Sequence, residues 1–216
     1  MDFKNQAGIQ CLTLGEPGSL TDASRRLSSG PGRISNGIIT ITTGDDGRIA
    51  LHDERDSSVY DGLFWFEDRA DCGDSYDYAP LDGDTALTSH TSGETEIVNT
   101  MTAGCKAVMT LRTEFPVPLQ LESGGAHVRG VRPFEFPLPV KGKRSEDLAI
   151  IEFVTTVTLF DNCDYALITV QFTNTAIQHR LRAGFHFRKR PQVLAGSSFS
   201  FTETSWTPES QLLAAE

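Results

Sequence analysis

The stretch Leu148–Phe160, LAIIEFVTTVTLF, has the clearest strand periodicity in the chain and decides the fold class. Its apolar side chains Ile151, Phe153, Val157 and Leu159 all occupy alternate positions. Because successive side chains of an extended strand point to opposite faces, these four share one face. The stretch therefore predicts a β-strand with one buried face and one face that is wet or partnered.

Two later segments repeat this alternation. Residues 165–173 place apolar side chains at every second position: Ala166, Ile168, Val170 and Phe172. Residues 180–188 do the same with Leu181, Ala183, Phe185 and Phe187. The turn sequence Asp161–Asp164 joins the first two strands. Three successive antiparallel strands, with earlier hairpins to pack on, predict an all-β fold of the antiparallel β-sandwich type.

The earlier part of the chain also contains strand signals. Gly37–Thr42 is rich in β-branched residues, and the turn sequence Gly44–Gly47 leads to a return strand at Arg48–His52. Val59–Phe66 is an aromatic-rich strand or strand pair. Residues 68–93 are rich in Asp, Gly, Ser, Thr and Pro, which predicts a long loop, and loops of that length are often functional.

The ends of the chain differ in composition from its centre. Residues 1–33 are rich in Gly, Ser and Pro and are assigned to a linker or poorly ordered tail, with a helical turn or two at Thr21–Leu27. Residues 34–188 form the predicted sandwich. Residues 189–216 lose the alternation, although Leu212–Ala215 could form a short helix.

Composition limits the partners of the chain. Its 216 residues carry a net charge of −10, and the pI is about 4.9, so nucleic acid and anionic membrane surfaces are not expected partners. No apolar run reaches the roughly 20 residues that span a bilayer, and the N-terminus does not resemble a secretory signal. The four cysteines form no Cys-x-x-Cys pair, which excludes a zinc ribbon. Few cysteines and no secretory signal favour a cytoplasmic chain with reduced thiols, and a disulfide pair stays open.

The acidic segment after Phe66 contains the main candidate site. Its aspartates recur at every third residue: Asp68, Asp71, Asp74 and Asp77. Carboxylate clusters can bind Ca²⁺, but this spacing is not that of an EF-hand loop, and the alternative is a solvated loop whose aspartates cap turns. Tyr76 and Tyr78 would point the same way in an extended segment. Such aromatics suit the stacking of sugar rings, or one of them packs under the loop.

A second candidate is a basic strand face in an otherwise acidic chain: Arg180, Arg182, His186 and Arg188. It could dock a second domain or reach an anionic group of a substrate. Alternatively, it pairs with acidic side chains across the sheet. Catalytic residues and metal ligands are not predicted, because the five histidines are scattered and no carboxylate pair, nucleophile elbow or phosphate loop is recognisable.

Three segments together resemble the C-terminal half of α-mannosidases of glycoside hydrolase family 38, in the bacterial branch that includes mannosylglycerate hydrolases. Asn36–Asp53 is similar to the opening hairpin of that family, and Leu63–Pro80 resembles its Asp-x-Gly-Asp-x-Tyr-Asp-Tyr-x-Pro signature. Val170–Asn174 followed by His179–Phe185 is similar to its Asn-x-x-x-Asp-His-Arg-Leu-Arg segment, with Gln178 in place of the usual Asp.

The resemblance implies a supersandwich-like, galactose-mutarotase-like fold, incomplete at the C-terminal end. It also implies that the nucleophile, the acid/base and the zinc ligands belong to a catalytic domain that these residues do not include. The chain would then be a non-catalytic portion of a mannoside-hydrolysing enzyme. That portion would support a catalytic domain of the same enzyme or of a partner chain.

The implied role leaves a set of sugar-contacting candidates: Asp68, Asp71, Asp74, Tyr76, Tyr78 and Arg182. No cofactor is expected in this chain itself. Two alternatives are a free-standing carbohydrate-binding module and an inactive remnant with a role in assembly.

Overall fold

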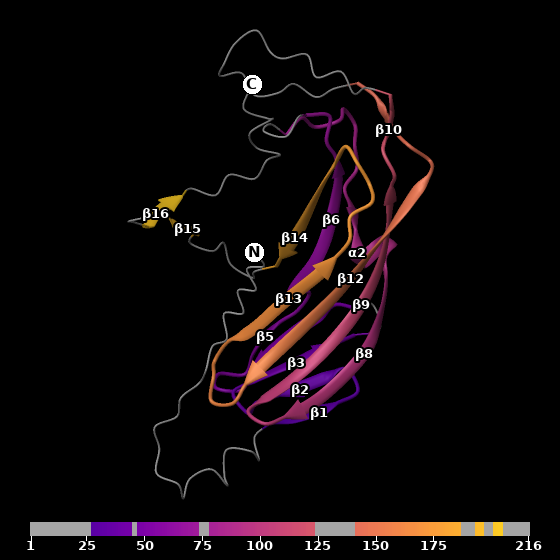
Figure 1. The fold of residues 1–216 in the computed structure, drawn as a ribbon. Coiled ribbons are helices and arrows are strands. Elements are labelled where there is room, and N and C mark those ends of the chain that lie inside the picture. Colours follow the sequence, from indigo (N-terminus) through magenta and orange to yellow (C-terminus); the bar gives the residue numbers. More distant parts are fainter. Residues whose placement is uncertain are drawn as a thin grey trace, which may run out of the picture.

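The computed structural model describes residues 27–44, 47–73, 78–123 and 141–186, together with the backbone of two short strands nearer the C-terminus. The described part is an antiparallel β-sandwich, as the alternation predicts (Figure 1). One layer is a sheet in the order β13-β12-β9-β8, with the bounds Ala166–Phe172, Leu148–Phe160, Lys106–Pro118 and Glu94–Ala103, respectively.

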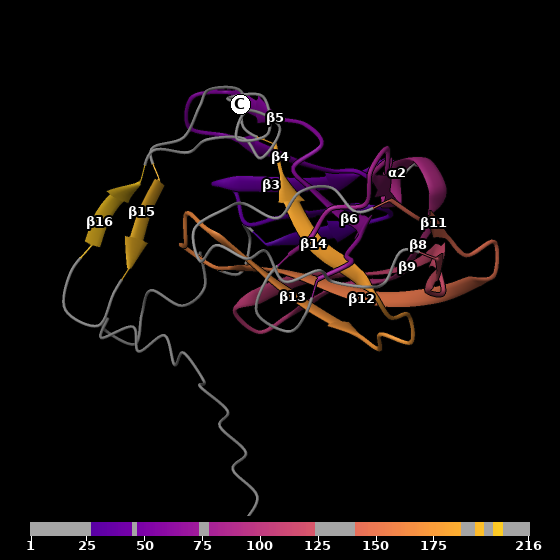
Figure 2. The same ribbon diagram turned by 90° about the horizontal axis from the view of Figure 1, so that it is seen from above.

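The other layer contains two sheets, and Figure 2 shows them lying over the first layer. The larger sheet has consecutive strands: β1, Ser28–Gly30; β2, Arg33–Ser35; β3, Ile39–Thr43; β4, Ile49–Asp53; and β5, Ser58–Tyr60. The smaller sheet has the order β14-β6-β7, with the bounds His179–Phe185, Phe64–Ala70 and Leu87–Thr88. The short helix α2, Ser89–Ser92, follows β7.

Two further strand pairs complete the described elements. Strand β10, Leu121–Ser123, pairs with β11, Lys143–Arg144. Strand β15, Val193–Gly196, pairs with β16, Phe201–Thr204, within the segment that the sequence left unassigned. The expected helix at Leu212–Ala215 and the helical turns at residues 21–26 lie outside the described residues.

Strand β12 is the centre of its layer. It pairs with β9 along its full length, from Leu148 opposite Pro118 to Phe160 opposite Lys106. The four side chains predicted for its buried face are all fully buried: Ile151, Phe153, Val157 and Leu159. The alternation of this strand therefore predicted its buried face correctly.

The three strands predicted as successive and antiparallel do not form one sheet. Strand β13 pairs with β12, whereas β14 pairs with β6 in the opposite layer. The chain crosses between the layers at residues 173–178, which end at Gln178 in a left-handed conformation (φ 54°). Alternation shows only that a strand has one buried face. Strands in both layers of a sandwich have one, so the pattern does not determine which sheet a strand joins.

The hairpin predicted before His52 is confirmed as β3 and β4, whose register runs from Ile39 opposite Asp53 to Thr43 opposite Ile49. The aromatic segment after Val59 contains two strands, β5 and β6, in different sheets. Strand β1 lies inside the stretch assigned to a tail. The long strands β8 and β9 had no counterpart in the predictions.

A row of phenylalanine rings joins the two layers. Phe66 on β6 stacks on Phe153 on β12, with ring centroids 3.7 Å apart and planes within 11°. Phe64 contacts Phe66 and Phe185 at 5.1 and 5.2 Å, and Phe153 contacts Phe172 at 5.2 Å. Such pairs add about 0.5–1.5 kcal/mol each beyond the burial of their area. The row therefore fixes how β6 lies against β12.

Candidate functional site

The outer face of β6 and β14 contains a patterned set of polar and aromatic side chains. Register pairs Glu67 with Arg182 and Trp65 with Gly184. Glu67 accepts hydrogen bonds from Arg182 and from Arg69, the latter at 3.0 Å. Arg182 thus pairs with an acidic side chain across the sheet, which was the second interpretation of the basic strand face.

These contacts set the charge state of Glu67. Burial on its own would raise the pKa of Glu67, but the hydrogen bonds and charges of Arg182 and Arg69 outweigh it and hold that pKa below its ordinary value of 4.5. Glu67 is therefore an ionised hydrogen-bond acceptor at neutral pH.

The acidic segment is divided between a strand and a turn. Asp71 lies beyond the end of β6, and its carboxylate accepts hydrogen bonds from the backbone N–H groups of Gly73 and Ala79, at 2.9 and 3.1 Å. This is the turn-capping arrangement that was the alternative to a calcium site. The guanidinium of Arg180 lies 4.5 Å from the centroid of the Tyr78 ring, a cation–π contact. Asp74, Tyr76 and Asp77, as well as Arg188 on the basic strand face, lie outside the described residues.

Asp68 does not lie in a loop, although the composition of residues 68–93 predicted one there. It occupies an inward position on β6, in line with Phe64, Phe66 and Ala70, and its side chain is 0% exposed. The strand alternation continues through Asp68, because the carboxylate has charged partners inside the fold. Its side chain therefore lies on the opposite face of β6 from those of Trp65 and Glu67.

The partners of Asp68 come from distant elements. Its two oxygens accept hydrogen bonds from Arg144 on β11 and from Nδ1 of His179 on β14. Nε2 of His179 lies 3.1 Å from Oδ1 of Asn174, and that oxygen also accepts the backbone N–H of Ala176 at 3.0 Å. Both ring nitrogens of His179 thus face oxygen acceptors. The cluster is a buried, paired charge centre that links three elements.

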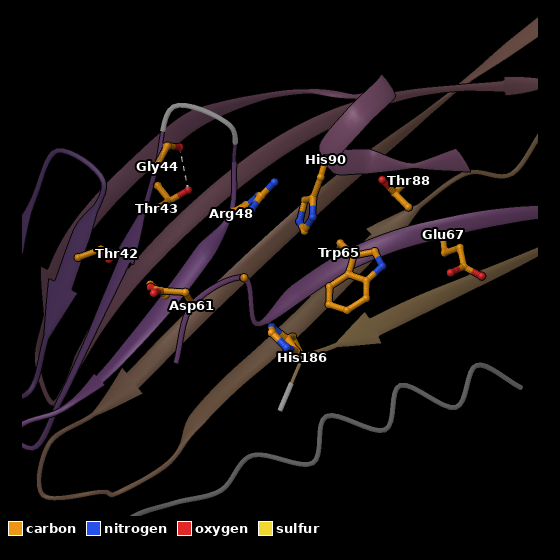
Figure 3. Close-up of a pocket in the computed structure, with 12 residues that line it drawn as sticks. Thr42, Thr43, Gly44, Arg48, Asp61, Trp65, Glu67, Thr88, His90 and His186 are labelled. Atoms are coloured by element: carbon orange, nitrogen blue, oxygen red, sulfur yellow. Dashed lines mark hydrogen bonds between the residues drawn. The ribbon is translucent and has the colours of Figure 1, made fainter. Parts of the chain in front are cut away.

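A groove opens beside the outer face of β6 (Figure 3). Its volume is about 880 Å³. The side chains that define it come from the residue before β4, the segment before β6, β6 itself, α2 and the residue after β14: Arg48, Asp61, Trp65, Glu67, His90 and His186. Sequence reasoning missed Trp65, although the alternation of residues 64–66 could have placed it on the outer face, opposite two buried phenylalanines.

Neither a metal-binding cluster nor a membrane-spanning helix is found among the described residues. There, no three His, Cys, Asp or Glu side chains gather closely enough to hold a metal ion. No helix within the described ranges has the length and apolar character needed to cross a membrane. The three described cysteines, Cys72, Cys105 and Cys163, have free thiols.

Comparisons with known proteins bear on the fold. No protein-family model and no curated protein matches the sequence. The structure of an α-mannosidase from Enterococcus faecalis V583 matches 73% of this chain, with a TM-score of 0.63 and 23% sequence identity. A protein of glycosyl hydrolase family 38 from Enterococcus faecalis matches 72% of the chain, with a TM-score of 0.59 and 22% identity.

The match covers only part of those proteins. This chain spans 18% of the first and 19% of the second. At such identity the likeness establishes a shared fold, and at that level it confirms the resemblance to family 38 α-mannosidases.

Proposed function

We propose that this chain is a non-catalytic β-sandwich portion of an α-mannosidase-like glycoside hydrolase. The observation that carries the proposal is the structural match to an α-mannosidase. The matched region covers 73% of this chain and 18% of the α-mannosidase chain. The sequence motifs agree with it, because the described parts of the segments that resemble the family, residues 36–44, 47–53, 63–73, 78–80, 170–174 and 179–185, belong to the sandwich or directly follow its strands.

The acidic side chains on the two faces of β6, Glu67 and Asp68, also support a non-catalytic role. Glycoside hydrolysis uses two carboxyl groups that face the scissile bond, one of them protonated as a general acid. Asp68 is sealed in the core by Arg144 and His179. Glu67 is held ionised by Arg182 and Arg69, which is the wrong state for a general acid.

In this proposal a zinc-dependent catalytic domain, on the same polypeptide or on a partner chain in the cytoplasm, performs the chemistry. The sandwich would support that domain. The rim formed by Asp71, Tyr78 and Arg182, with Asp74 and Tyr76 beyond the described residues, would contact a mannoside. Arginine and tyrosine on one polar rim suit both a protein surface and sugar hydroxyls.

The test is an assay of the purified chain with an aryl α-mannoside, with and without added zinc. We expect no turnover in either condition. Metal-dependent turnover that persists through repeated purification would overturn the non-catalytic assignment.

Coexpression with the adjoining reading frame tests the supporting role, if that frame encodes a zinc-binding catalytic domain. The two chains should copurify and hydrolyse the mannoside together. Arg180→Glu, which replaces the cation over the Tyr78 ring of the proposed rim, should weaken the association. Arg112→Glu, a matched charge reversal on the outer face of β9, should not. Equal effects of both variants would contradict a docking role for the rim.

A second candidate function is self-assembly, which exposed apolar side chains on the β13-β12-β9-β8 sheet favour. Leu148 and Ile150 on β12 are 60% and 61% exposed, and Pro118 and Pro116 lie opposite them on β9. Contiguous exposed apolar side chains are typical of interaction surfaces. Light scattering decides this candidate, because a monomer at all concentrations would rule out self-assembly through this face.

A further inference from the structure

The indole of Trp65 is held in place by its neighbours. A Cβ atom on Gly184 would lie only 2.4 Å from Cε2 of Trp65 and 2.6 Å from Cζ2. The ring therefore lies directly against the backbone of β14, in space that only glycine leaves open. The His90 ring packs near it, with centroids 5.6 Å apart and planes tilted by 49°.

The remaining surface of the indole borders the groove. Figure 3 shows Trp65 between His90 and His186, with Arg48 and Asp61 farther along the same groove. The volume of about 880 Å³ falls in the range of roughly 300–1,000 Å³ found for small-molecule sites. A rigid aromatic surface beside an open volume can stack the C–H face of a ring.

The polar side chains around the groove suit a ligand with many hydroxyl groups. Carboxylates of Asp61 and Glu67 accept hydrogen bonds, the guanidinium of Arg48 donates them, and the hydroxyl of Thr88 does either. Glu67 already accepts hydrogen bonds from Arg182 and Arg69, and the Thr88 hydroxyl lies 3.0 Å from that of Thr91, but a carboxylate and a hydroxyl oxygen can each accept further bonds. The lining therefore contains both kinds of hydrogen-bonding group that sugar hydroxyls use.

The charges of the groove favour a neutral ligand. Asp61 and Glu67 both line it, and the whole chain carries a net charge of −10. Arg48 also lines the groove, and Glu67 is paired with Arg182 and Arg69, so the lining offers an anionic ligand no excess of positive charge, while the overall charge of the chain opposes it. Among ligands with many hydroxyl groups, the unphosphorylated saccharides remain.

We infer that the groove beside Trp65 is a binding subsite for a neutral saccharide, whose ring stacks on the indole. The inference deepens the proposed function, because it adds a sugar contact at Trp65 beside the rim of Asp71, Tyr78 and Arg182, to which it is joined by the hydrogen bond from Arg182 to Glu67. It also explains why a glycine lies opposite Trp65 in the register of β6 and β14, since any larger residue would displace the indole.

The experiment uses tryptophan fluorescence together with calorimetry. The chain has two tryptophans, Trp65 and Trp206, and a Trp206→Phe background makes Trp65 the only indole. Mannose and mannobiose are titrated at millimolar concentrations, with adenosine as a flat, neutral comparison ligand. We expect a saturable change in Trp65 fluorescence and matching heat with a saccharide, and neither with adenosine.

Variants test the stacking surface in the wild-type background by calorimetry. Trp65→Ala should weaken saccharide binding about tenfold or more, a loss of about 1.4 kcal/mol or greater. Trp65→Phe keeps a smaller ring and should lose less, so it remains informative if the alanine variant does not fold. Gly184→Ala should also weaken binding, because it displaces the indole without removing a polar contact. Tyr165→Ala, an exposed aromatic just before β13 in the other layer and outside the groove lining, should have no effect.

Three results would overturn the inference: no saccharide binding by the unmodified chain at tens of millimolar, adenosine binding in place of the sugars, or full affinity in Trp65→Ala. Full affinity in Trp65→Ala combined with loss in Tyr78→Ala would move the sugar to the rim and leave the proposed function intact. The proposed function fails on a different measurement, the zinc-dependent turnover of the isolated chain, so the two failures are distinguishable.

Discussion

The side-chain amide of Asn36 holds the backbone of Cys163: its Nδ2 donates a hydrogen bond to the carbonyl oxygen of Cys163 at 2.7 Å. The same nitrogen donates to the carbonyl oxygen of Phe160 at 2.7 Å, while Oδ1 accepts the N–H groups of Ile38 and Ile39. Asn36 is fully buried between β2 and β3. One side chain thus links the turn of one layer to the β12–β13 turn of the other.

Asn36→Asp tests this link. Aspartate keeps the two accepted bonds but cannot donate, so the carbonyl groups of Phe160 and Cys163 lose their partner and a buried charge faces them. We expect a loss of roughly 2–4 kcal/mol in the free energy of unfolding, measured by urea denaturation. Asn99→Asp, on the exposed strand β8, is the matched control and should change stability by less than about 0.5 kcal/mol.

Asp68→Asn tests the buried charge cluster. The change removes the closer carboxylate partner of Arg144, which keeps only Asp84 at 3.7 Å, and the carboxylate that faces His179; breaking a buried pair of this kind costs about 3–5 kcal/mol. Thermal unfolding should show a large fall in the midpoint, or no folded protein at all. Asp82→Asn, an exposed change of the same chemistry, should behave like the unmodified chain. Equal stability of the two variants would refute the structural role of the cluster.

Glu67 should make folding sensitive to acid. Its pKa is lowered in the folded chain, so the carboxylate stabilises the fold at pH values above 4.5, its ordinary pKa. As the pH falls below 4.5, the unfolded chain takes up the proton first, and this stabilisation is lost through the folded-state pKa. The stability difference between the unmodified chain and Glu67→Gln should therefore shrink from pH 6 to pH 3. A constant difference across that range would contradict the ion pair.

Gly93→Ala should destabilise the junction between α2 and β8. A Cβ at this position would lie 2.7 Å from the carbonyl oxygen of Ser89 and 3.1 Å from that of Glu114, both backbone atoms that cannot move alone. Overpacking of this kind costs about 1–3 kcal/mol, measurable by chemical denaturation. Gly30→Ala is the matched control, since a Cβ there meets nothing within 4 Å.

Local patterns in the sequence predicted the elements whose formation is local. The buried face of β12 and the β3–β4 hairpin follow from alternation and turn residues within a few positions of each other. Strand β9 was missed although its inward side chains also alternate. Pro116 and Pro118 argue against a central strand, yet both lie near the end of β9, at positions outside the buried face.

The candidate site was harder to predict because its contacts are long-range. Asp68 resembled a loop residue since its partners, Arg144 and His179, lie 76 and 111 residues away. Trp65 lies on the outer face of its strand, but the groove beside it exists only once β4, α2 and the end of β14 come together. Neither fact can be read from neighbouring residues.

The pairing of β6 with β14 has a consequence for synthesis on the ribosome. Until β14 emerges, the only strand in the sheet of β6 is the two-residue β7, and Phe66 has no Phe153 to stack on until β12 is complete. Strands that pair late leave apolar edges open to other chains. Until residues 179–185 have been synthesised, one edge of β6 therefore stays unpaired, and a pause in translation before residue 179 is expected to favour aggregation.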